Sequence, residues 1–205
     1  FYQPKLVIAD LNMLSTLPDR ERIAGWAETI KHGMILDEQL VEDIELHVDD
    51  LLSLEPEATA RVIRRSVAIK AGVVTEDERE STGQRAILNY GHTIAHALET
   101  ATEYGEYLHG EAVAIGMTAA AAIGLTLGIT PESLVNRQSK LLERFGLPVR
   151  CKEINLKSAL TAMELDKKTT DGDINWVLLS EMAQPIRRSK VPQTLVKQVL
   201  QDLLY

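Results

Sequence analysis

Hydrophobic residues recur every three or four positions over most of the chain, with polar residues between them. Within 37–54, Leu40, Ile44, Val48 and Leu51 share one face and acidic residues occupy the other, a pattern typical of an amphipathic helix. Similar patterns, with capping residues at several ends, predict further helices at 55–74, 88–100, 109–128, 131–146 and 192–204. The chain is therefore expected to be helical through its middle.

The hydrophobic period changes at both ends of the chain. Residues 5–10, KLVIAD, have the composition of a short strand, and a helix is expected soon after it with Thr16 or Ser15 as its cap. Residues 174–180, INWVLLS, are also strand-like, and 185–190, PIRRSK, are expected to pair with them as a hairpin. The predicted fold class is mainly α: a helical bundle with a short strand at the start and a small β-hairpin near the end.

Composition narrows the classes of function. The 205 residues carry a net charge of −8, which argues against binding to nucleic acid or to a membrane surface, so an anionic ligand needs a local cluster of Lys and Arg. The apolar run at 112–128 is too short and too rich in Ala and Gly for a membrane span. The single cysteine, Cys151, excludes an internal disulfide and fits a reducing compartment, so we expect a cytoplasmic protein.

A run of polar residues interrupts the helical pattern around LNYGHTIAHALET. Arg85, Asn89, His92 and His96 follow at spacings of four, three and four, which predicts one continuous polar stripe along a helix. A solvated face is usually rich in Glu and Lys, whereas this stripe consists of Arg, Asn and His. The two histidines are either a structural pair or part of a metal or acid/base site, and the composition of the stripe favours a site.

Three further polar clusters accompany this stripe. Glu28 and Lys31 lie at i and i+3 in GWAETIKHG, and His109 immediately precedes an apolar helix. Glu28 with two of the histidines would supply the three N or O ligands of a catalytic zinc site. Thr93 stands where a zinc protease of the H-E-x-x-H type needs its general-base Glu, so peptide hydrolysis is excluded. In the last cluster, LDKK, the lysines end a predicted helix and are commonly only dipole partners.

The order of these motifs resembles one known family. FYQPKLVIAD, GWAETIKHG, KAGVV, EDERE, LNYGHTIAHALE, LHGEAVAIGM and LDKK are similar, in this order, to the C-terminal part of the 3-dehydroquinate synthase family. The resemblance implies one helical metal- and substrate-binding domain over 1–205, with 1–15 as the tail of a missing N-terminal NAD-binding Rossmann-like domain. It also implies that the chain by itself is inactive, because the cofactor pocket belongs mostly to that other domain.

The resemblance also implies roles for individual residues. It assigns Glu28, His92 and His109 as metal ligands, with His96 as an acid/base residue beside the metal and Glu80 as the proton acceptor. Residues implied to be catalytic or to hold the phosphate, carboxylate and hydroxyls of the substrate are Lys31, Lys70, Arg85, Asn89, Lys167 and Lys168. Leu14 and Thr16 match the segment that touches the cofactor. One departure is that ERESTGQR is one residue longer than the family's usual form.

The implied activity is that of a lyase of the shikimate pathway, which leads to chorismate and the aromatic amino acids. This reaction converts 3-deoxy-D-arabino-heptulosonate 7-phosphate to 3-dehydroquinate and phosphate through oxidation by NAD, elimination, reduction and aldol closure on zinc, with Co²⁺ as an alternative metal. A cytoplasmic homodimer is expected. Alternatives are another sugar phosphate cyclase such as 2-deoxy-scyllo-inosose synthase, an iron-type alcohol dehydrogenase, or a non-catalytic helical module.

Overall fold

The computed structural model describes residues 5–78, 83–103, 105–152, 156–169 and 174–204, with 164–169 described by their backbone alone. The predicted fold class is confirmed, since helices dominate and one hairpin lies near the C-terminus. The elements are η1 (Leu11–Thr16), α1 (Asp19–Leu36), α2 (Glu38–Leu46), α3 (Val48–Leu52), α4 (Pro56–Glu76), η2 (Gln84–Asn89), α5 (His92–Ala101), α6 (His109–Thr126), α7 (Glu132–Arg144), α8 (Leu156–Thr169), β1 (Trp176–Glu181), β2 (Gln184–Arg188) and α9 (Gln193–Leu203), where η marks a 3₁₀ helix.

Helix α6 is the centre of the molecule. It contacts α1, α5, α7, α9 and β1, and most of its residues between Gly110 and Gly124 are buried, on every side of the helix. A helix that is apolar all round must be covered all round, which explains the Ala- and Gly-rich run of its sequence. Among the described residues, none of the helices combines the length and the apolar character that crossing a bilayer requires.

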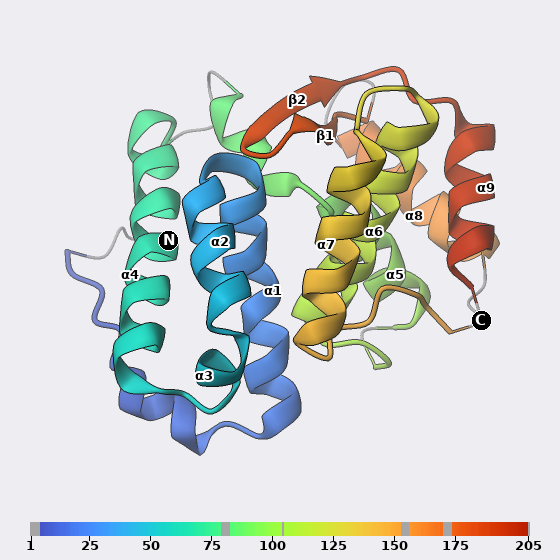
Figure 1. Cartoon of the computed structure of the whole chain (residues 1–205). Coiled ribbons are helices and arrows are strands. Elements are labelled where there is room, and N and C mark those ends of the chain that lie inside the picture. Colours follow the sequence, from blue (N-terminus) through green and yellow to red (C-terminus); the bar gives the residue numbers. More distant parts are fainter. Residues whose placement is uncertain (1–4, 79–82, 104, 153–155, 170–173, 205) are drawn as a thin grey trace.

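The helices form two groups that meet at α1 and α6. Figure 1 shows α1, α2 and α4 side by side on one side of the molecule, and α5 to α9 on the other. The hairpin lies across one end of both groups, because β1 packs on α6 while β2 contacts α1. Its strands are antiparallel, with Trp176 opposite Arg188 and Leu178 opposite Ile186, so the predicted hairpin is confirmed.

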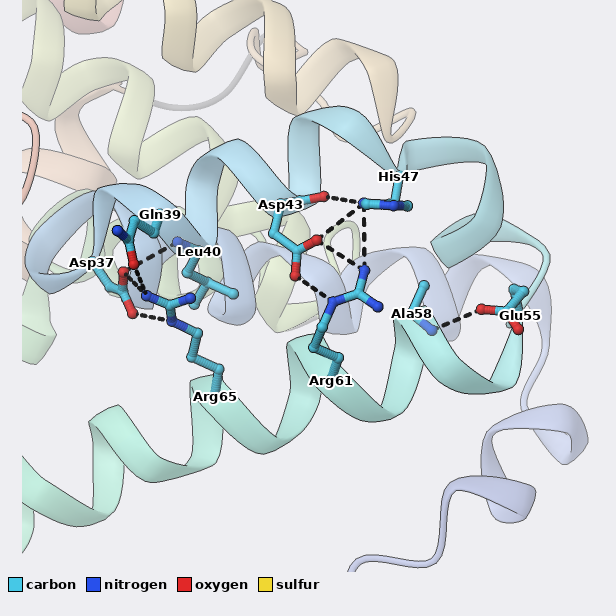
Figure 2. A network of polar contacts seen from close by, with 9 residues as sticks. All are labelled: Asp37, Gln39, Leu40, Asp43, His47, Glu55, Ala58, Arg61 and Arg65. Carbon is cyan, nitrogen blue, oxygen red and sulfur yellow. Dashed lines mark hydrogen bonds and ion pairs between the residues drawn. The ribbon is translucent and has the colours of Figure 1, made fainter.

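Helices α2 and α4 are joined by a row of ion pairs on the surface (Figure 2). Arg61 makes two hydrogen bonds of 2.8 Å to the carboxylate of Asp43, and Arg65 binds the carboxylate of Asp37 through both Nε and Nη2. We call these four residues the α2–α4 ladder. Each arginine faces one carboxylate in a two-pronged geometry, which holds the two helices in register.

The expected single helix over 37–54 is interrupted at His47. The backbone there leaves helical geometry, with φ −116° and ψ 26°, and α3 starts at the next residue. The ring of His47 approaches the carbonyl oxygen of Asp43 at 2.9 Å, so it completes the end of α2. The prediction missed this break because Val48 and Leu51 remain buried after it and keep the apolar spacing intact.

Two expectations about the start of the chain are wrong. Residues 5–10 form neither strand nor helix, and Leu6, Val7 and Ile8 are exposed. A strand requires a partner for its backbone groups, and the described residues offer none here. Thr16 does not cap α1, since its hydroxyl donates to the carbonyl of Met13 at 2.7 Å and the helix begins later, at Asp19.

Candidate functional site

A cavity of about 340 Å³ lies where five elements meet. Its lining consists of Glu28, Lys31 and His32 from α1, Lys70 from α4, Arg85, Leu88 and Asn89 from η2, His92 from α5 and His109 from α6. Nearly all of these side chains are polar, and three of them are cations of Lys or Arg. A hollow of this size fits a small polar molecule, and the cationic side chains favour an anionic one.

Three side chains at this cavity form a potential metal site. Glu28, His92 and His109 each offer a ligand atom, and these atoms lie within 4.8 Å of one another. Oε1 of Glu28 lies 3.3 Å from Nε2 of His92 and 3.4 Å from Nε2 of His109. Tetrahedral ligands about 2.0–2.1 Å from a zinc ion would stand roughly 3.4 Å apart, so the spacing fits an ion held between them.

Close packing between α1 and α6 brings His109 over Glu28. A Cβ atom on Gly110 would lie 1.9 Å from the carbonyl oxygen of Ala24, so only glycine allows the two helices to approach here. Arg20 of α1 reinforces this contact, because its Nε and Nη2 atoms each lie 2.7 Å from the carboxylate of Glu111 on α6. Gly110 and Glu111 of LHGEA therefore together fix the position of the histidine that precedes them.

The expected helix over 88–100 is divided, and the polar stripe with it. η2 ends at Asn89, and α5 starts at His92 after Gly91, whose φ of +82° suits glycine. A Cβ on Gly91 would lie 2.7 Å from the backbone nitrogen of Met117, so α6 packs directly against this turn. Arg85 and Asn89 consequently reach the cavity from a different element than the histidines, and the continuous helical stripe is wrong.

Both histidines of the potential metal site have their Nδ1 atoms engaged away from Glu28. Nδ1 of His92 faces the backbone oxygen of Tyr90 at 3.3 Å, and Nδ1 of His109 faces Oε1 of Glu99 at 2.9 Å. Both acceptors favour a proton on Nδ1. The Nε2 atoms, which face Glu28, are thereby left to coordinate a cation.

Electrostatics keep Glu28 ionised. Burial opposes its charge, but the hydrogen bond with His92 and the positive charge of Lys31, whose Nζ lies 2.7 Å from Oε2, outweigh burial and hold the pKa of Glu28 far below its usual range. Burial is the main reason that the pKa of Lys31 is lowered, with Glu28 opposing the shift. A cation that binds here displaces any proton from the ligating nitrogen of His92, since a coordinating imidazole is neutral.

Sequence reasoning missed His32, which lines the same cavity. It is buried, its Nδ1 lies 2.8 Å from Oγ of Ser66 on α4, and its Nε2 lies 4.0 Å from Oε2 of Glu28. Burial, and then the charge of Lys31, lower the pKa of His32 to about 4, so it is neutral near pH 7. Its spacing of four from Glu28 was the available signal, because residues at i and i+4 share a helix face.

His96 lies beside the three potential ligands but outside the cavity lining. Its ring is edge-on to His92, with centroids 5.5 Å apart, and its centroid is 6.5 Å from that of His109. The side chain is exposed. This position is compatible with the predicted acid/base role, which stays a prediction.

Other predicted residues are spread more widely. Leu14 and Thr16 belong to η1, which packs on α4, and neither is part of the cavity lining. Glu80 lies outside the described residues, and so do the side chains of Lys167 and Lys168 at the end of α8. Their predicted roles therefore stay predictions.

Comparison with known sequences identifies related proteins. Residues 25–169 match the family described as 3-dehydroquinate synthase C-terminal. A 3-dehydroquinate synthase of Methylacidiphilum infernorum is 44% identical over 205 residues, which is 100% of this chain and 55% of that protein. One from Methylococcus capsulatus is 49% identical over 185 residues, which is 90% of this chain and 51% of that protein. The chain thus spans about half the length of the curated relatives that it matches.

Two solved structures of sugar phosphate cyclases share this fold. The 2-epi-5-epi-valiolone synthase of Streptomyces hygroscopicus subsp. jinggangensis 5008, with NAD⁺ and Zn²⁺ bound, has a TM-score of 0.85 and 26% identity, over 95% of this chain and 54% of that chain. A 2-deoxy-scyllo-inosose synthase, in complex with carbaglucose-6-phosphate, NAD⁺ and Co²⁺, has a TM-score of 0.82 and 31% identity, over 100% of this chain and 58% of that chain.

Proposed function

Because this chain belongs to the 3-dehydroquinate synthase C-terminal family, we propose that it is the metal- and substrate-binding part of a 3-dehydroquinate synthase. The proposed reaction converts 3-deoxy-D-arabino-heptulosonate 7-phosphate to 3-dehydroquinate and phosphate. The observation that carries the proposal is the convergence of Glu28, His92 and His109 beside a cavity that is lined by cationic side chains. An N-terminal NAD-binding domain of the same enzyme is the proposed partner, since the relatives are nearly twice as long.

A divalent metal fits the three converging residues. One carboxylate oxygen and two imidazole nitrogens are a donor set that zinc accepts, and the adjoining cavity leaves room for a substrate oxygen as a further ligand. Glu28, His92 and His109 would hold the ion, and cobalt is an acceptable substitute for it. When bound, zinc would act as a Lewis acid on a substrate hydroxyl, and NAD⁺ would accept a hydride.

The substrate anions would be bound by side chains from α1, α4 and η2. Lys70 and Arg85 line the cavity beside Lys31, which already pairs with Glu28. A phosphate dianion or a carboxylate gains charge-assisted hydrogen bonds from such groups, and a planar guanidinium binds either one through two hydrogen bonds. Asn89 adds donors and an acceptor for hydroxyls without a fixed charge.

The remaining proposed roles concern protons and the cofactor. His96 lies next to the proposed ligands and would exchange protons with the reacting substrate, with Glu80 as the proton acceptor. Leu14 and Thr16 would touch NAD from this side. Since the sequence contains no dinucleotide-binding fingerprint, most of the cofactor would be held outside this chain. Lys167 or Lys168 would add a further positive charge to the binding site for the substrate.

A phosphate-release assay tests this function. The chain would be joined to the N-terminal domain of a relative, loaded with zinc and NAD, and given the heptulosonate phosphate. Release of phosphate with formation of 3-dehydroquinate and no build-up of NADH is the expected result, because the cofactor is recycled. Steady accumulation of NADH would contradict the proposal in favour of a dehydrogenase.

Another sugar phosphate cyclase is the second candidate, because a 2-deoxy-scyllo-inosose synthase shares the fold at 31% identity. Glucose 6-phosphate, which carbaglucose 6-phosphate resembles, would be offered in parallel as substrate. The higher identity of 44% to a curated 3-dehydroquinate synthase favours the heptulosonate phosphate. Turnover of glucose 6-phosphate alone would reverse the assignment.

A further inference from the structure

Glu99 is a buried carboxylate close to the proposed metal site. Only 8% of this residue is exposed, and its Oε1 lies 2.9 Å from Nδ1 of His109. A buried carboxylate is costly unless a donor compensates it, and His109 is such a donor. His109 itself is half-exposed, with 50% of its side chain accessible, so packing alone does not fix its ring. The contact therefore orders a side chain that would otherwise rotate.

Helix α5 places Glu99 where it reaches His109. His92, His96 and Glu99 follow at spacings of four and three, so they share one face of α5. Because α5 packs against α6, this face meets His109 at the start of α6. Helix α5 thus carries the proposed ligand His92 and also supports the proposed ligand His109 on α6.

The hydrogen bond determines which nitrogen of His109 is available. An ionised carboxylate only accepts, and Glu99 lies closer to Nδ1 (2.9 Å) than Glu28 lies to Nε2 (3.4 Å), so the proton of a neutral His109 ring lies on Nδ1. The lone pair of Nε2 then faces Oε1 of Glu28, 3.4 Å away. Without this partner the ring could rotate or carry its proton on Nε2, and either change removes one ligand. A carboxylate that accepts a hydrogen bond from a ligating histidine also makes the imidazole more basic, and therefore a stronger ligand for the metal.

We propose that Glu99 is a positioning residue of the metal site, which holds His109 in the orientation and tautomer that present Nε2 to a divalent cation. The inference rests on the proposed function, because it requires the metal site of Glu28, His92 and His109. Glu99 does not itself touch the ion. It would act through its contact with His109.

Zinc affinity of the purified chain tests this role. Zinc would be titrated in competition with a chromophoric chelator into the parent, Glu99→Gln, Glu99→Ala and the control Glu103→Gln. Glu103 lies just after α5, is exposed, and loses the same charge on substitution. The zinc affinity of Glu99→Ala is expected to be roughly 10- to 100-fold lower than that of the parent. The affinity of Glu99→Gln should fall less, because its amide oxygen still accepts a hydrogen bond from Nδ1 of His109. Glu103→Gln should match the parent.

Two spectroscopic readouts separate positioning from a merely structural role. In the metal-free parent, long-range ¹H–¹⁵N NMR should report His109 as the Nδ1–H tautomer, and Glu99→Ala should shift it toward Nε2–H. With Co²⁺ bound, the visible absorption bands of Glu99→Gln should differ from those of the parent. If Glu99 had a merely structural role, folded Glu99→Gln would instead have a lower thermal stability and an unchanged Co²⁺ spectrum.

The possible failures are distinguishable. Parent protein that binds no zinc would overturn the proposed metal site. Parent protein that binds zinc while both folded Glu99 variants bind it equally well would overturn the positioning role alone. An unchanged His109 tautomer in Glu99→Ala would also overturn the positioning role alone. If Glu99→Ala does not fold, the nearly isosteric Glu99→Gln still decides the question through its affinity and its Co²⁺ spectrum.

Discussion

Helix α4 contributes to two polar regions, the ladder and the cavity, which differ in how their charges are paired. In the α2–α4 ladder, Arg61 and Arg65 each face one carboxylate in a two-pronged geometry (Figure 2). At the cavity, one carboxylate, Glu28, is shared by Lys31, His92 and His109, and Lys70 and Arg85 add further donors. The ladder is balanced within itself, whereas the cavity gathers three Lys or Arg side chains and two potential histidine ligands around Glu28.

This difference separates a structural role from a functional one. Pairs in the ladder fix the register of two helices and need no other molecule. The cavity, by contrast, collects Lys and Arg side chains and converging histidine nitrogens, an arrangement that suits a divalent metal ion and an anion. Each of the following changes tests that distinction, from the largest expected effect to the smallest.

Removal of a proposed ligand should have the largest effect. His109→Ala takes one of three converging donors, so zinc content measured by elemental analysis should fall from about one ion per chain to a small fraction of that. The loss should exceed the roughly 10- to 100-fold expected for an outer partner of the metal. His47→Ala, at the ladder, is the matched control and should retain its zinc. Equal zinc content in both variants would make the proposed ligand set wrong.

Removal of a positively charged side chain from the cavity should weaken the use of the substrate and leave metal binding unchanged. Lys70→Ala deletes a charge that lines the cavity, and a hydrogen bond to a charged group is worth about 1.5–3 kcal/mol. In the enzyme joined to the proposed NAD-binding domain, kcat/KM for the proposed phosphate substrate should fall by roughly 10- to 100-fold with zinc content unchanged. Arg64→Ala, exposed on the same helix, should leave kcat/KM unchanged. A similar decrease in both variants would point to a general loss of charge.

Disruption of the ladder should affect stability alone. Arg61 is 47% exposed and Asp43 is 18% exposed, so their pairing should contribute about 1 kcal/mol or less to the free energy of unfolding. A double-mutant cycle of Asp43→Asn and Arg61→Ala, followed by urea unfolding, measures this interaction. Zinc binding should stay the same in all three variants. A loss of zinc here would mean that the two regions are coupled.

The ladder should also give a small dependence of stability on pH. The hydrogen bonds from Arg61 lower the pKa of Asp43 below its usual value, with burial opposing the shift. The folded state therefore binds this proton less readily than the unfolded state, so the stabilisation is complete above the unfolded pKa of about 4 and is lost as pH falls through the lower folded pKa. Urea midpoints between pH 6 and pH 3 should drop less in Asp43→Asn than in the parent. An equal drop would assign the acid sensitivity to other groups.

The sequence by itself determined the helical character, the hairpin and the residues that converge on one another. Its amphipathic spacing predicted α2, α4 and α7, and the change of period predicted β1 and β2. Glu28, His92 and His109 were named from residue types and from the resemblance of their motifs. These features are local in the chain, since both periodicity and motifs are read from neighbouring residues.

The tertiary structure alone decided how those residues meet. The break at Gly91 follows from the close approach of α6, and His109 reaches Glu28 because Gly110 packs against Ala24. The contacts of Glu99 with His109 and of His32 with Ser66 likewise join different helices. A hydrophobic pattern reports which face of a helix is buried but not which helix covers it. Contacts between distant segments therefore depend on packing, where the presence or absence of a single Cβ decides how closely two backbones approach.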